Sequence, residues 1–553
     1  MNKLILIAFL LPIFASAQWT TDTLLNTQVS QNPSLEETTP LMTEGPDGKT
    51  YISYFKSNGS QYEMYMQLLD SLGNKLWGTT GLLISSFPQN SAIFRYDLAT
   101  DHQGNAIVAF QDERLGYLSV VAYKLDPSGA FLWSSSGVQL GDNLASEDLS
   151  PAIGITSSND VVVAWNSNNG GPKWVAFQKI SSNGIIMWGR THRCIDSTFV
   201  KKFSRPAIVP LDNDRFMMMV IQETGSFPFT NTIFMNKYDS DGELVGVPSQ
   251  VSTKTTSFFD FPKVAAKNAE GAFIGFNTSN PAAPTMNDVY VQYVDSNLAL
   301  PWTATGTELS ASVTEHKNIA SLHYLPDSNK VFCMMKVLDG SQSNAGVFVQ
   351  KLDAAGTNML GVNAQQVFAV SATYYDPFGA SDVGDGMILV YTIGGFGNEH
   401  VRAIKTDYSG VPAWAGDVAV SSVNSNKDDG AVSHYRNGQV VVSWSDDRSG
   451  NGIYAQNILG NGSLGIPSGL PHIPGNNWKV FVDYTGSPRL FIESQHADNT
   501  VIRITDVDGR LLLQKKITVN GRMMLPLENY APGIYIVSLI NGTPSSFRIL
   551  LPK

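Results

Sequence analysis

The chain has 553 residues, of which 43% are hydrophobic and 15% are charged, and its formal net charge is -11. A hydrophobic fraction of this size in so long a chain can bury a large core, and 48 glycines with 27 prolines indicate many turns. The acidic balance leaves no basic surface for polyphosphate, so nucleic acid is not an expected partner.

The N-terminus has the parts of a secretory signal peptide. Lys3 supplies the positive charge, residues 4–14 are apolar but too few to span a bilayer, and Ala15–Ala17 fits the small-x-small cleavage rule. We therefore expect residues 1–17 to be a signal peptide. No later run of about 18 apolar residues predicts a membrane span.

Eight short apolar runs then recur with a nearly constant spacing. Each has five residues and is flanked by Gly, Asn or Asp, which is typical of strands buried on both faces. The runs are Tyr51–Phe55, Ala106–Phe110, Val161–Trp165, Phe216–Val220, Ala272–Phe276, Val331–Met335, Met387–Tyr391 and Val440–Trp444. A repeat of this length predicts one supersecondary unit that packs against its neighbours.

An Asp-x-x-Gly turn follows the next strand of most repeats, with clear copies at Asp70, Asp126, Asp239, Asp353 and Asp407. The Asp can accept hydrogen bonds from its own turn, and the Gly can adopt a positive φ. After the turn we expect the outer strand of each unit, which opens on Trp or another large side chain. We interpret this side chain as packing between units. These residues are Trp19, Trp77, Trp133, Trp188, Val245, Trp302, Leu360 and Trp414.

The two ends of the repeat region complete each other. The last copy stops before its Trp strand, and residues 18–30 look like that missing strand. A ring of repeats closes in this way when the N-terminus fastens the final unit. We therefore predict an all-β fold with an eight-bladed β-propeller over residues 18–465, in which residues 19–30 pair beside Ile453–Ile458. A seven-bladed ring with an irregular unit is the alternative.

Candidate ligand-binding residues lie in the loops opposite the uniform turns, because variable loops on a constant scaffold carry binding sites. Acidic, aromatic and Arg side chains together suit sugar recognition, since aromatic faces stack on sugar rings and carboxylates accept hydrogen bonds from hydroxyls. The candidates are Asp112, Arg114, Asp446, Asp447, Arg448, Tyr374 and Tyr375. In the alternative interpretation, each Asp and Arg pair simply holds its own loop in place.

Sequence signatures of catalysis and of cofactors are sparse. The chain has no HExxH zinc motif, GxSxG nucleophile elbow or phosphate-binding glycine loop. No cofactor or metal is expected, and calcium is left open only at Asp239–Glu243, whose carboxylates lie in a uniform turn. Cys194 and Cys333 fall in different repeats, and we interpret both as buried free thiols.

After the repeats, residues 466–477 are rich in Gly, Pro, Ser and Asn, which predicts a linker. Residues 478–553 then alternate like short strands, with a hairpin at Asp506–Arg510 and a turn at Pro532–Gly533. This pattern predicts a separate small C-terminal β-sandwich.

The end of this domain resembles the type A C-terminal sorting domain that Bacteroidetes-type bacteria use for export through the type IX secretion system. The matching elements are Ile504–Asp506 leading to Gly509 and Arg510, the strand Met524–Leu527, and Gly533–Val537 followed by a short tail that ends at Lys553. The usual opening Pro-Asn-Pro is missing, and Asp483–Pro488 stands in its place. The resemblance implies a sorting signal that includes Gly509, Gly533, Tyr535 and Lys553. It also implies the type IX machinery as a partner, and a location outside the cell or on its outer surface after periplasmic passage.

Two functions of different classes remain open. The first is a secreted or cell-surface, non-catalytic binding propeller for a glycan or protein ligand. The second is a polysaccharide-active hydrolase or lyase on the same propeller, because a carboxylate pair on separate loops leaves no local motif. Whether the chain is an enzyme is therefore open, and the lack of catalytic motifs favours the first function.

Overall fold

The computed structural model describes residues 19–30, 35–89, 92, 94–141, 147–168, 173–189, 191–194, 201–225, 229–257, 260–280, 283–465, 478–483, 488–506, 510–528, 530–541 and 543–551. The chain separates into two compact units. One consists of Met1–Tyr435 and Gln439–Ile466, and the other of Arg436–Gly438 and Pro467–Lys553. The predicted signal peptide and linker lie outside the described residues.

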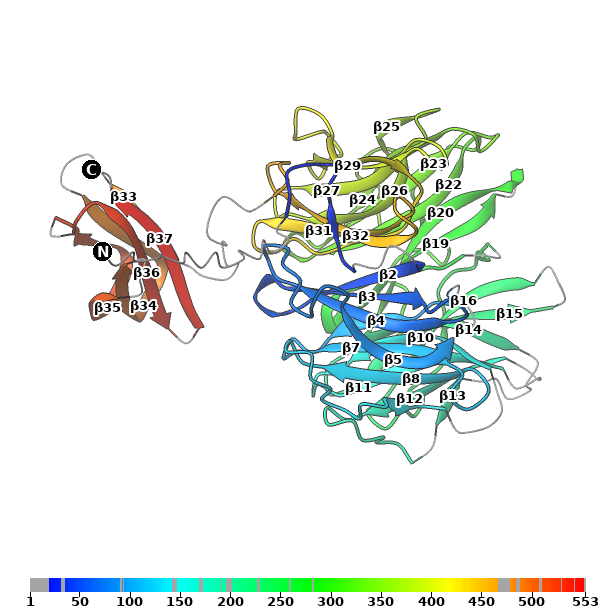
Figure 1. Cartoon of the computed structure of the whole chain (residues 1–553). Helices are drawn as coiled ribbons and strands as arrows, with labels where there is room; N and C mark the ends of the chain where they lie inside the picture. The colour runs from blue at the N-terminus through cyan, green and yellow to red at the C-terminus, as the bar shows by residue number, and fades with distance from the viewer. Residues whose placement is uncertain are drawn as a thin grey trace, which may run out of the picture. The chain divides into compact units, whose positions relative to one another are not determined.

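The described residues of the first unit form eight four-stranded antiparallel sheets, as the eight repeats predict (Figure 1). The first four sheets are β2 (Glu37–Glu44), β3 (Thr50–Ser57), β4 (Tyr62–Leu69) and β5 (Leu82–Gln89); β6 (Asp97–Thr100), β7 (Ala106–Asp112), β8 (Ser119–Leu125) and β9 (Val138–Gln139); β10 (Glu147–Ile155), β11 (Val161–Asn168), β12 (Trp174–Ile180) and β13 (His192–Cys194); and β14 (Lys202–Pro210), β15 (Phe216–Thr224), β16 (Thr230–Tyr238) and β17 (Ser249–Gln250).

The next three sheets are β18 (Lys263–Ala266), β19 (Gly271–Asn280), β20 (Ala283–Asp295) and β21 (Thr307–Glu308); β22 (His316–Leu325), β23 (Lys330–Leu338), β24 (Ala345–Leu352) and β25 (Gln365–Ser371); and β26 (Asp376–Asp382), β27 (Met387–Ile393), β28 (Glu399–Thr406) and β29 (Val418–Ser425). The eighth joins β30 (Lys427–Val432), β31 (Gln439–Asp446) and β32 (Gly452–Leu459) to β1 (Thr27–Gln28). Three short 3-10 turns, η1 (Pro46–Gly48), η2 (Asn268–Glu270) and η3 (Pro326–Ser328), connect first and second strands.

The sheets are arranged as the blades of a closed ring. The innermost strand of each sheet contacts that of the next, from β2 through β6, β10, β14, β18, β22, β26 and β30, and β30 contacts β2 again. The second strands are buried on both faces, as the apolar runs predict; every residue of β7 and β31 is buried. Apolar layers between neighbouring sheets therefore form the core of the ring.

The N-terminal segment closes the eighth blade, which confirms the predicted pairing. In β1, Thr27 pairs with Ala455 and Gln28 with Tyr454 of β32. Trp19 and Val29 are buried in one cluster with residues of the first and eighth blades. The ring thus joins the beginning of the described chain to its eighth repeat.

The Trp residues after the turns pack between blades, but they do not open the outer strands as expected. Trp77, for example, stands five residues before the first residue of β5. Its indole N–H instead donates to the carbonyl of Pro127 in the turn of the next blade, at 3.1 Å. The same bond joins Trp19 to Ser71, Trp133 to Ser182, Trp188 to Ser240, Trp302 to Ala354 and Trp414 to Gly460, at 3.0–3.3 Å. The indole is drawn toward the neighbouring turn, so the strand begins only after it.

The turn glycine leaves room for this indole. A Cβ built on Gly356 would lie 2.5 Å from the ring of Trp302, and the φ of Gly356 is +81°. The fifth blade has Leu298 at the equivalent place, with φ of 66°, and there the preceding blade offers Val245 in place of Trp. Leu298 packs in the apolar cluster of Met235 and Val251. At each of the six seams with a Trp, the turn residue that faces its ring is Gly. Gly410, at the seam with Leu360, instead faces Val349 and Gln365.

The C-terminal unit is a small sandwich made by long, bent strands. Its described strands are β33 (Trp478–Asp483), β34 (Arg489–Asp506), β35 (Leu511–Pro526), β36 (Gly533–Asn541) and β37 (Thr543–Leu551). The first half of β34 pairs with β33, and its second half, beyond a register shift after Ser494, pairs with β36. Leu490 and Ile492 of the first half share a core with Ile502, Ile504 and Val537.

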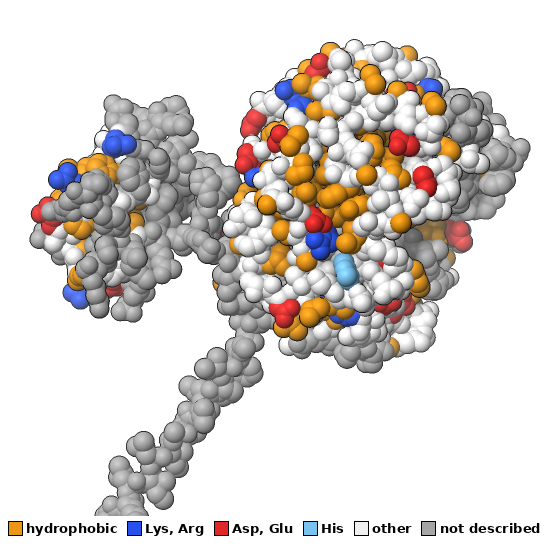
Figure 2. Space-filling view, turned by 90° about the horizontal axis from the view of Figure 1, so that it is seen from above, with side chains coloured by type: hydrophobic (Ala, Val, Ile, Leu, Met, Phe, Trp, Pro, Cys, Tyr) orange, Lys and Arg blue, Asp and Glu red, His pale blue; other side chains and the backbone are white. Residues whose placement is uncertain are grey.

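The surface of the propeller also carries exposed hydrophobic side chains. Figure 2 looks onto the propeller from the side on which β25 and β29 lie in Figure 1, and hydrophobic side chains gather in the middle of that face. Single exposed apolar side chains are normal on protein surfaces and do not by themselves indicate a site. In the described part of the chain, no helix has the length and hydrophobicity needed to cross a membrane.

Candidate functional site

A bulge near the start of six of the described innermost strands turns residues out of the regular ladder. Such bulges re-aim side chains. Thr39, Ser150, Arg205 and Asp429 stand at the bulge of their strands with φ between 51° and 55°. By strand register, Arg95 and Phe261 hold the same place in the second and fifth blades.

An amide side chain from the preceding blade holds several of these bulges. The N–H of Ser150 donates to Gln111 Oε1 at 3.0 Å, that of Arg205 to Asn166 Oδ1 at 2.7 Å, and that of Ile319 to Asn277 Oδ1 at 2.9 Å. Each bond pairs a main-chain donor that the bulge has taken out of the ladder. The backbone is thus held independently of which side chain the bulge residue carries.

A cavity of about 680 Å³ lies in the channel against the innermost strands of the first five blades. This volume is within the range of small-molecule sites, about 300–1,000 Å³. Its charged lining residues are Arg95, Lys173, Arg205, Asp97 and Glu223, and its apolar lining includes Leu41, Ile153 and Phe261. These residues lie mainly at the ends of the blades opposite the Asp-x-x-Gly turns, so we call the cavity the channel-mouth cavity.

Two arginines from different blades stack on one aromatic ring at this cavity. The guanidinium carbon of Arg95 lies 3.5 Å from the ring centroid of Phe261, and that of Arg205 lies 4.8 Å from it. Arg205 is further held by a 2.8 Å hydrogen bond from Nη1 to the carbonyl of Asp260. Arg95, in contrast, donates no hydrogen bond to any described residue, so its N–H edges are free to take a ligand.

Several positively charged side chains around the cavity lie close enough to repel one another. Burial and the nearby charge of Arg205 lower the pKa of Arg95, while Asp260 and Asp429 act against this shift. Burial and the charge of Arg95 also lower the pKa of Lys263. Like charges that lie close together in a poorly solvated space favour an added anion, because the anion relieves their repulsion.

The acidic groups at the cavity are already engaged. Asp97 accepts hydrogen bonds from the N–H of Ile153 and of Leu98, and burial raises its pKa. Asp260 accepts both the main-chain and side-chain N–H of Asn277, and burial raises its pKa to about 7. Glu223 accepts the hydroxyl of Ser204 at 3.3 Å.

The predicted pair of the second blade, Asp112 and Arg114, is buried and holds its own loop. Arg114 donates to both carboxylate oxygens of Asp112, at 2.8 and 2.7 Å, and to the hydroxyl of Tyr123. The side chain of Asp112 is 0% exposed and that of Arg114 is 9% exposed. The arrangement is that of a bidentate internal ion pair.

The matching pair of the eighth blade is equally internal. Arg448 donates to Asp446 at 2.5 Å, to Asn26 Oδ1 at 3.1 Å and to Ser421 at 2.9 Å, and so ties the N-terminal segment to the blade. Burial raises the pKa of Asp446, but the hydrogen bond and charge of Arg448 outweigh it and lower this pKa overall. Asp447 is exposed, and its carboxylate accepts one hydrogen bond from the main-chain N–H of Asn426 and one from its side-chain amide.

The two predicted tyrosines lie in the loop between β25 of the sixth blade and β26 of the seventh, and neither lines the channel-mouth cavity. Tyr375 stacks on Phe368 with ring centroids 4.5 Å apart, and it also contacts Tyr391. The ammonium of Lys336 lies 4.8 Å from the ring centroid of Tyr374. Their contacts thus belong to packing within the propeller.

No group of three His, Cys, Asp or Glu side chains suited to a metal is found among the described residues. In the Asp239–Glu243 turn, Asp239 Oδ1 accepts the main-chain N–H groups of Asp241 and Glu243. Cys333 is buried and free, as expected, and burial raises the pKa of its thiol. The side chain of Cys194 lies outside the described residues.

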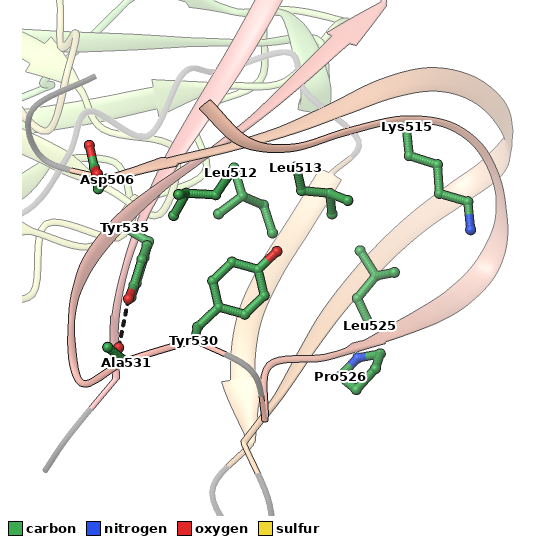
Figure 3. Close-up of a pocket in the computed structure, with 10 residues that line it drawn as sticks. Asp506, Leu512, Leu513, Lys515, Leu525, Pro526, Tyr530, Ala531 and Tyr535 are labelled. Carbon is green, nitrogen blue, oxygen red and sulfur yellow. Dashed lines mark hydrogen bonds between the residues drawn. The ribbon is translucent and has the colours of Figure 1, made fainter. Parts of the chain in front are cut away.

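In the C-terminal unit, Tyr535 is placed by a 2.6 Å hydrogen bond from its hydroxyl to the carbonyl of Ala531. It lines a hollow of about 660 Å³ with Tyr530, Leu512, Leu513 and Leu525, and Figure 3 shows Tyr530 in the middle of it. Gly533 opens β36, and a Cβ there would meet nothing closer than the Tyr535 ring at 3.9 Å. Gly509 and Lys553 lie outside the described residues.

Sequence reasoning missed Arg95, Arg205 and Phe261. A signal for two of them was present, because a variable residue precedes Pro at the same place in Thr39-Pro40, Ser150-Pro151, Arg205-Pro206 and Phe261-Pro262. The Pro restricts the residue before it, and in the first, third and fourth blades that residue stands at the bulge. Arg95 is followed by Tyr96 and has no such signal.

Comparisons with known proteins distinguish the two units. Residues 487–551 match the family of the secretion system C-terminal sorting domain. No curated protein matches the chain in sequence. In structure the chain is similar to an ulvan lyase of polysaccharide lyase family PL25, at 8% identity and a TM-score of 0.44, over 80% of this chain and 96% of that chain.

It is also similar to an α-L-arabinanase of Penicillium chrysogenum complexed with arabinobiose, at 11% identity and a TM-score of 0.34, over 72% of this chain and 99% of that chain. The fold rests on the eight sheets themselves and the export signal on the matched C-terminal residues. The chain is a β-propeller protein with a type IX secretion C-terminal sorting domain, which directs it to the cell surface or the extracellular space.

Proposed function

We propose that the exported propeller is a non-catalytic binding module that holds its ligand in the channel-mouth cavity. The observation that carries this proposal is the cavity of about 680 Å³ into which Arg95 and Lys173 bring cationic groups that donate to no described residue. Groups of this kind are available to a ligand without breaking an internal bond. The Asp112 and Asp446 loops would then support the scaffold rather than touch the ligand.

Binding is favoured over hydrolysis by the state of the carboxyl groups. A glycoside hydrolase typically needs two carboxyl groups that both reach the substrate, one as acid and one as base or nucleophile. Among the described residues at the cavity, Asp97 and Asp260 each use both oxygens on N–H donors of the protein. Glu223 is left as a single carboxylate facing the cavity, which does not make a pair.

A glycan array combined with a reducing-end release assay tests this function. The mature chain should bind at least one glycan without releasing new reducing ends. Ala207→Trp, which fills the cavity from β14, should abolish the binding, whereas Ala372→Trp in an exposed turn should not. Ala152→Leu gives a smaller plug should the Trp variant unfold. Product release by the wild-type chain that Ala207→Trp abolishes would instead support the polysaccharide-active alternative.

The export half of the function has its own test. Removing residues 533–553 deletes β36 and β37 from the sorting domain and leaves the propeller strands untouched. We expect the truncated chain to fold but to stay in the periplasm, measured as the fraction of protein outside the cell and by the thermal unfolding of the retained protein. Equal amounts of truncated and full-length protein outside the cell would contradict the assignment.

A further inference from the structure

The channel-mouth cavity is cationic in a chain that is acidic overall. Its lining holds three basic side chains, Arg95, Lys173 and Arg205, against two acidic ones, Asp97 and Glu223, while the formal net charge of the chain is -11. The two acids accept hydrogen bonds from the protein, whereas Arg95 and Lys173 donate none to the described residues. Basic side chains therefore outnumber acidic ones in the lining, and Asp260 and Asp429 act on Arg95 from outside it.

The position of Arg95 suits an oxyanion. Its guanidinium lies against the ring of Phe261 at 3.5 Å, so the aromatic surface covers the flat face of the cation and leaves the N–H edges open. A guanidinium offers paired donors along its edges, which match the two oxygens of a carboxylate or two oxygens of a sulfate. Arg205, which already donates to Asp260, contributes charge from the other blade.

We propose that the channel-mouth cavity binds an acidic saccharide through a carboxylate or sulfate group held at Arg95 and Lys173. This inference rests on the proposed binding function and names its ligand class. A planar carboxylate and a tetrahedral sulfate both present two anionic oxygens to a guanidinium edge, and the test below separates them.

The rest of the lining favours a saccharide over an acidic peptide. Ser150, Ser204 and Asn166 bring hydroxyl and amide groups to the cavity, and the remaining lone pairs of Glu223 can accept hydrogen bonds from sugar hydroxyls. A Glu- or Asp-rich peptide has few hydroxyl donors to offer and would bring further carboxylates toward Glu223 and Asp97. Repulsion between these carboxylates would oppose binding of such a peptide.

Isothermal titration calorimetry with four probes of equal length tests the proposal. The probes are an oligogalacturonate, a sulfated dextran oligosaccharide, a neutral dextran oligosaccharide and an oligoglutamate, each titrated into the mature full chain. We expect one of the two acidic saccharides to bind, with an affinity that falls as salt is added. The neutral oligosaccharide should bind at least about tenfold more weakly than this acidic saccharide. The stronger of the two acidic probes identifies the source group.

Variants locate the site. Arg95→Ala should weaken the acidic saccharide about tenfold or more, and Arg95→Lys, which keeps the charge but not the paired donors, should lie between it and wild type. Arg215→Ala removes an arginine from a turn at the opposite end of the blade and should leave the affinity unchanged. The melting temperature of Arg95→Ala should fall only slightly, because the variant loses the stacking on Phe261 but no hydrogen bond to the described residues.

Four results would overturn the inference. The first two are equal binding of the neutral and acidic saccharides, and stronger binding of oligoglutamate than of either acidic saccharide. The others are an Arg95→Ala affinity equal to that of wild type, and absence of binding by all four probes. The proposed function would survive any of these if a glycan on the array still binds wild type and not Ala207→Trp, so the two failures are distinguishable.

Discussion

The two ends of the propeller blades follow opposite rules. At the turn end, six of the eight seams repeat one contact, in which a Trp of one blade donates to the turn of the next and packs on its Gly. At the mouth end, the equivalent bulge position holds Thr39, Arg95, Ser150, Arg205, Phe261 or Asp429. At the turn end the Trp side chain itself forms the contact between blades, so the same residue recurs. At the mouth, main-chain bonds and a neighbour's amide hold the bulge, and the side chain is free to vary.

The largest effect is expected where the ring is closed. Deleting residues 18–32 removes buried Trp19 and Val29 and the pairing of β1 with β32. Loss of a buried Trp alone costs about 3–5 kcal/mol, so for a ring of this size we expect the midpoint of thermal unfolding to fall by about 5 °C or more. Differential scanning calorimetry of the mature chain measures this. An unchanged midpoint would show that the N-terminal segment does not hold the ring together.

The buried ion pairs of the loops come next. Arg114→Ala leaves the buried carboxylate of Asp112 without its bidentate partner, which typically costs about 3–5 kcal/mol. Arg448→Ala should cost less, because Asp446 keeps Lys427 at 3.6 Å and the indole N–H of Trp444. We expect stability to fall in urea unfolding while ligand affinity at the channel-mouth cavity is kept, the reverse of Arg95→Ala. If both loop variants instead lose ligand binding at full stability, these loops are the binding site.

A pair of glycines separates the seam from backbone strain. Gly356 and Gly361 have φ of +81° and +84°, but a Cβ on Gly356 would meet the ring of Trp302, whereas one on Gly361 would meet nothing within 4 Å. Gly361→Ala should cost about 1–2 kcal/mol from the left-handed backbone alone. Gly356→Ala should cost about 1–3 kcal/mol more than Gly361→Ala, because the added methyl group overpacks the seam. Equal losses in chemical unfolding would mean that the Trp contact tolerates a methyl group.

The smallest effect is a pH dependence at the mouth. Burial raises the pKa of Asp260 to about 7, above its unfolded value of about 4. Between these values the native protein holds a proton that the unfolded chain has released, so the contribution of Asp260 to stability falls as pH rises through this window. Asp260→Asn should flatten the decline in melting temperature between about pH 4 and pH 7. The exposed turn variant Asp241→Asn should keep the wild-type slope, and an identical slope in both would contradict the shift.

Much of the scaffold could be predicted because it depends on local patterns. The apolar runs, the Asp-x-x-Gly turns and the incomplete last repeat were enough to predict the eight sheets and the pairing of β1 with β32. The outer strands were placed too early, because the indole N–H of each Trp bonds to a carbonyl in the next blade, a partner about 50 residues away in the chain. A sequence pattern shows that a Trp recurs but not which carbonyl it meets.

The channel-mouth cavity shows most clearly what could not be predicted from the sequence. Composition, repeat spacing and the C-terminal motif by themselves determined that the chain is an exported all-β ring, since each depends on neighbouring residues. Only the tertiary structure decided that Asp112 and Arg114 are buried in their own loop, and that Arg95 of the second blade reaches Phe261 of the fifth. Ring closure brings distant blades to one channel, and burial decides which charges stay free there. Neither depends on the residues beside Arg95 in the chain.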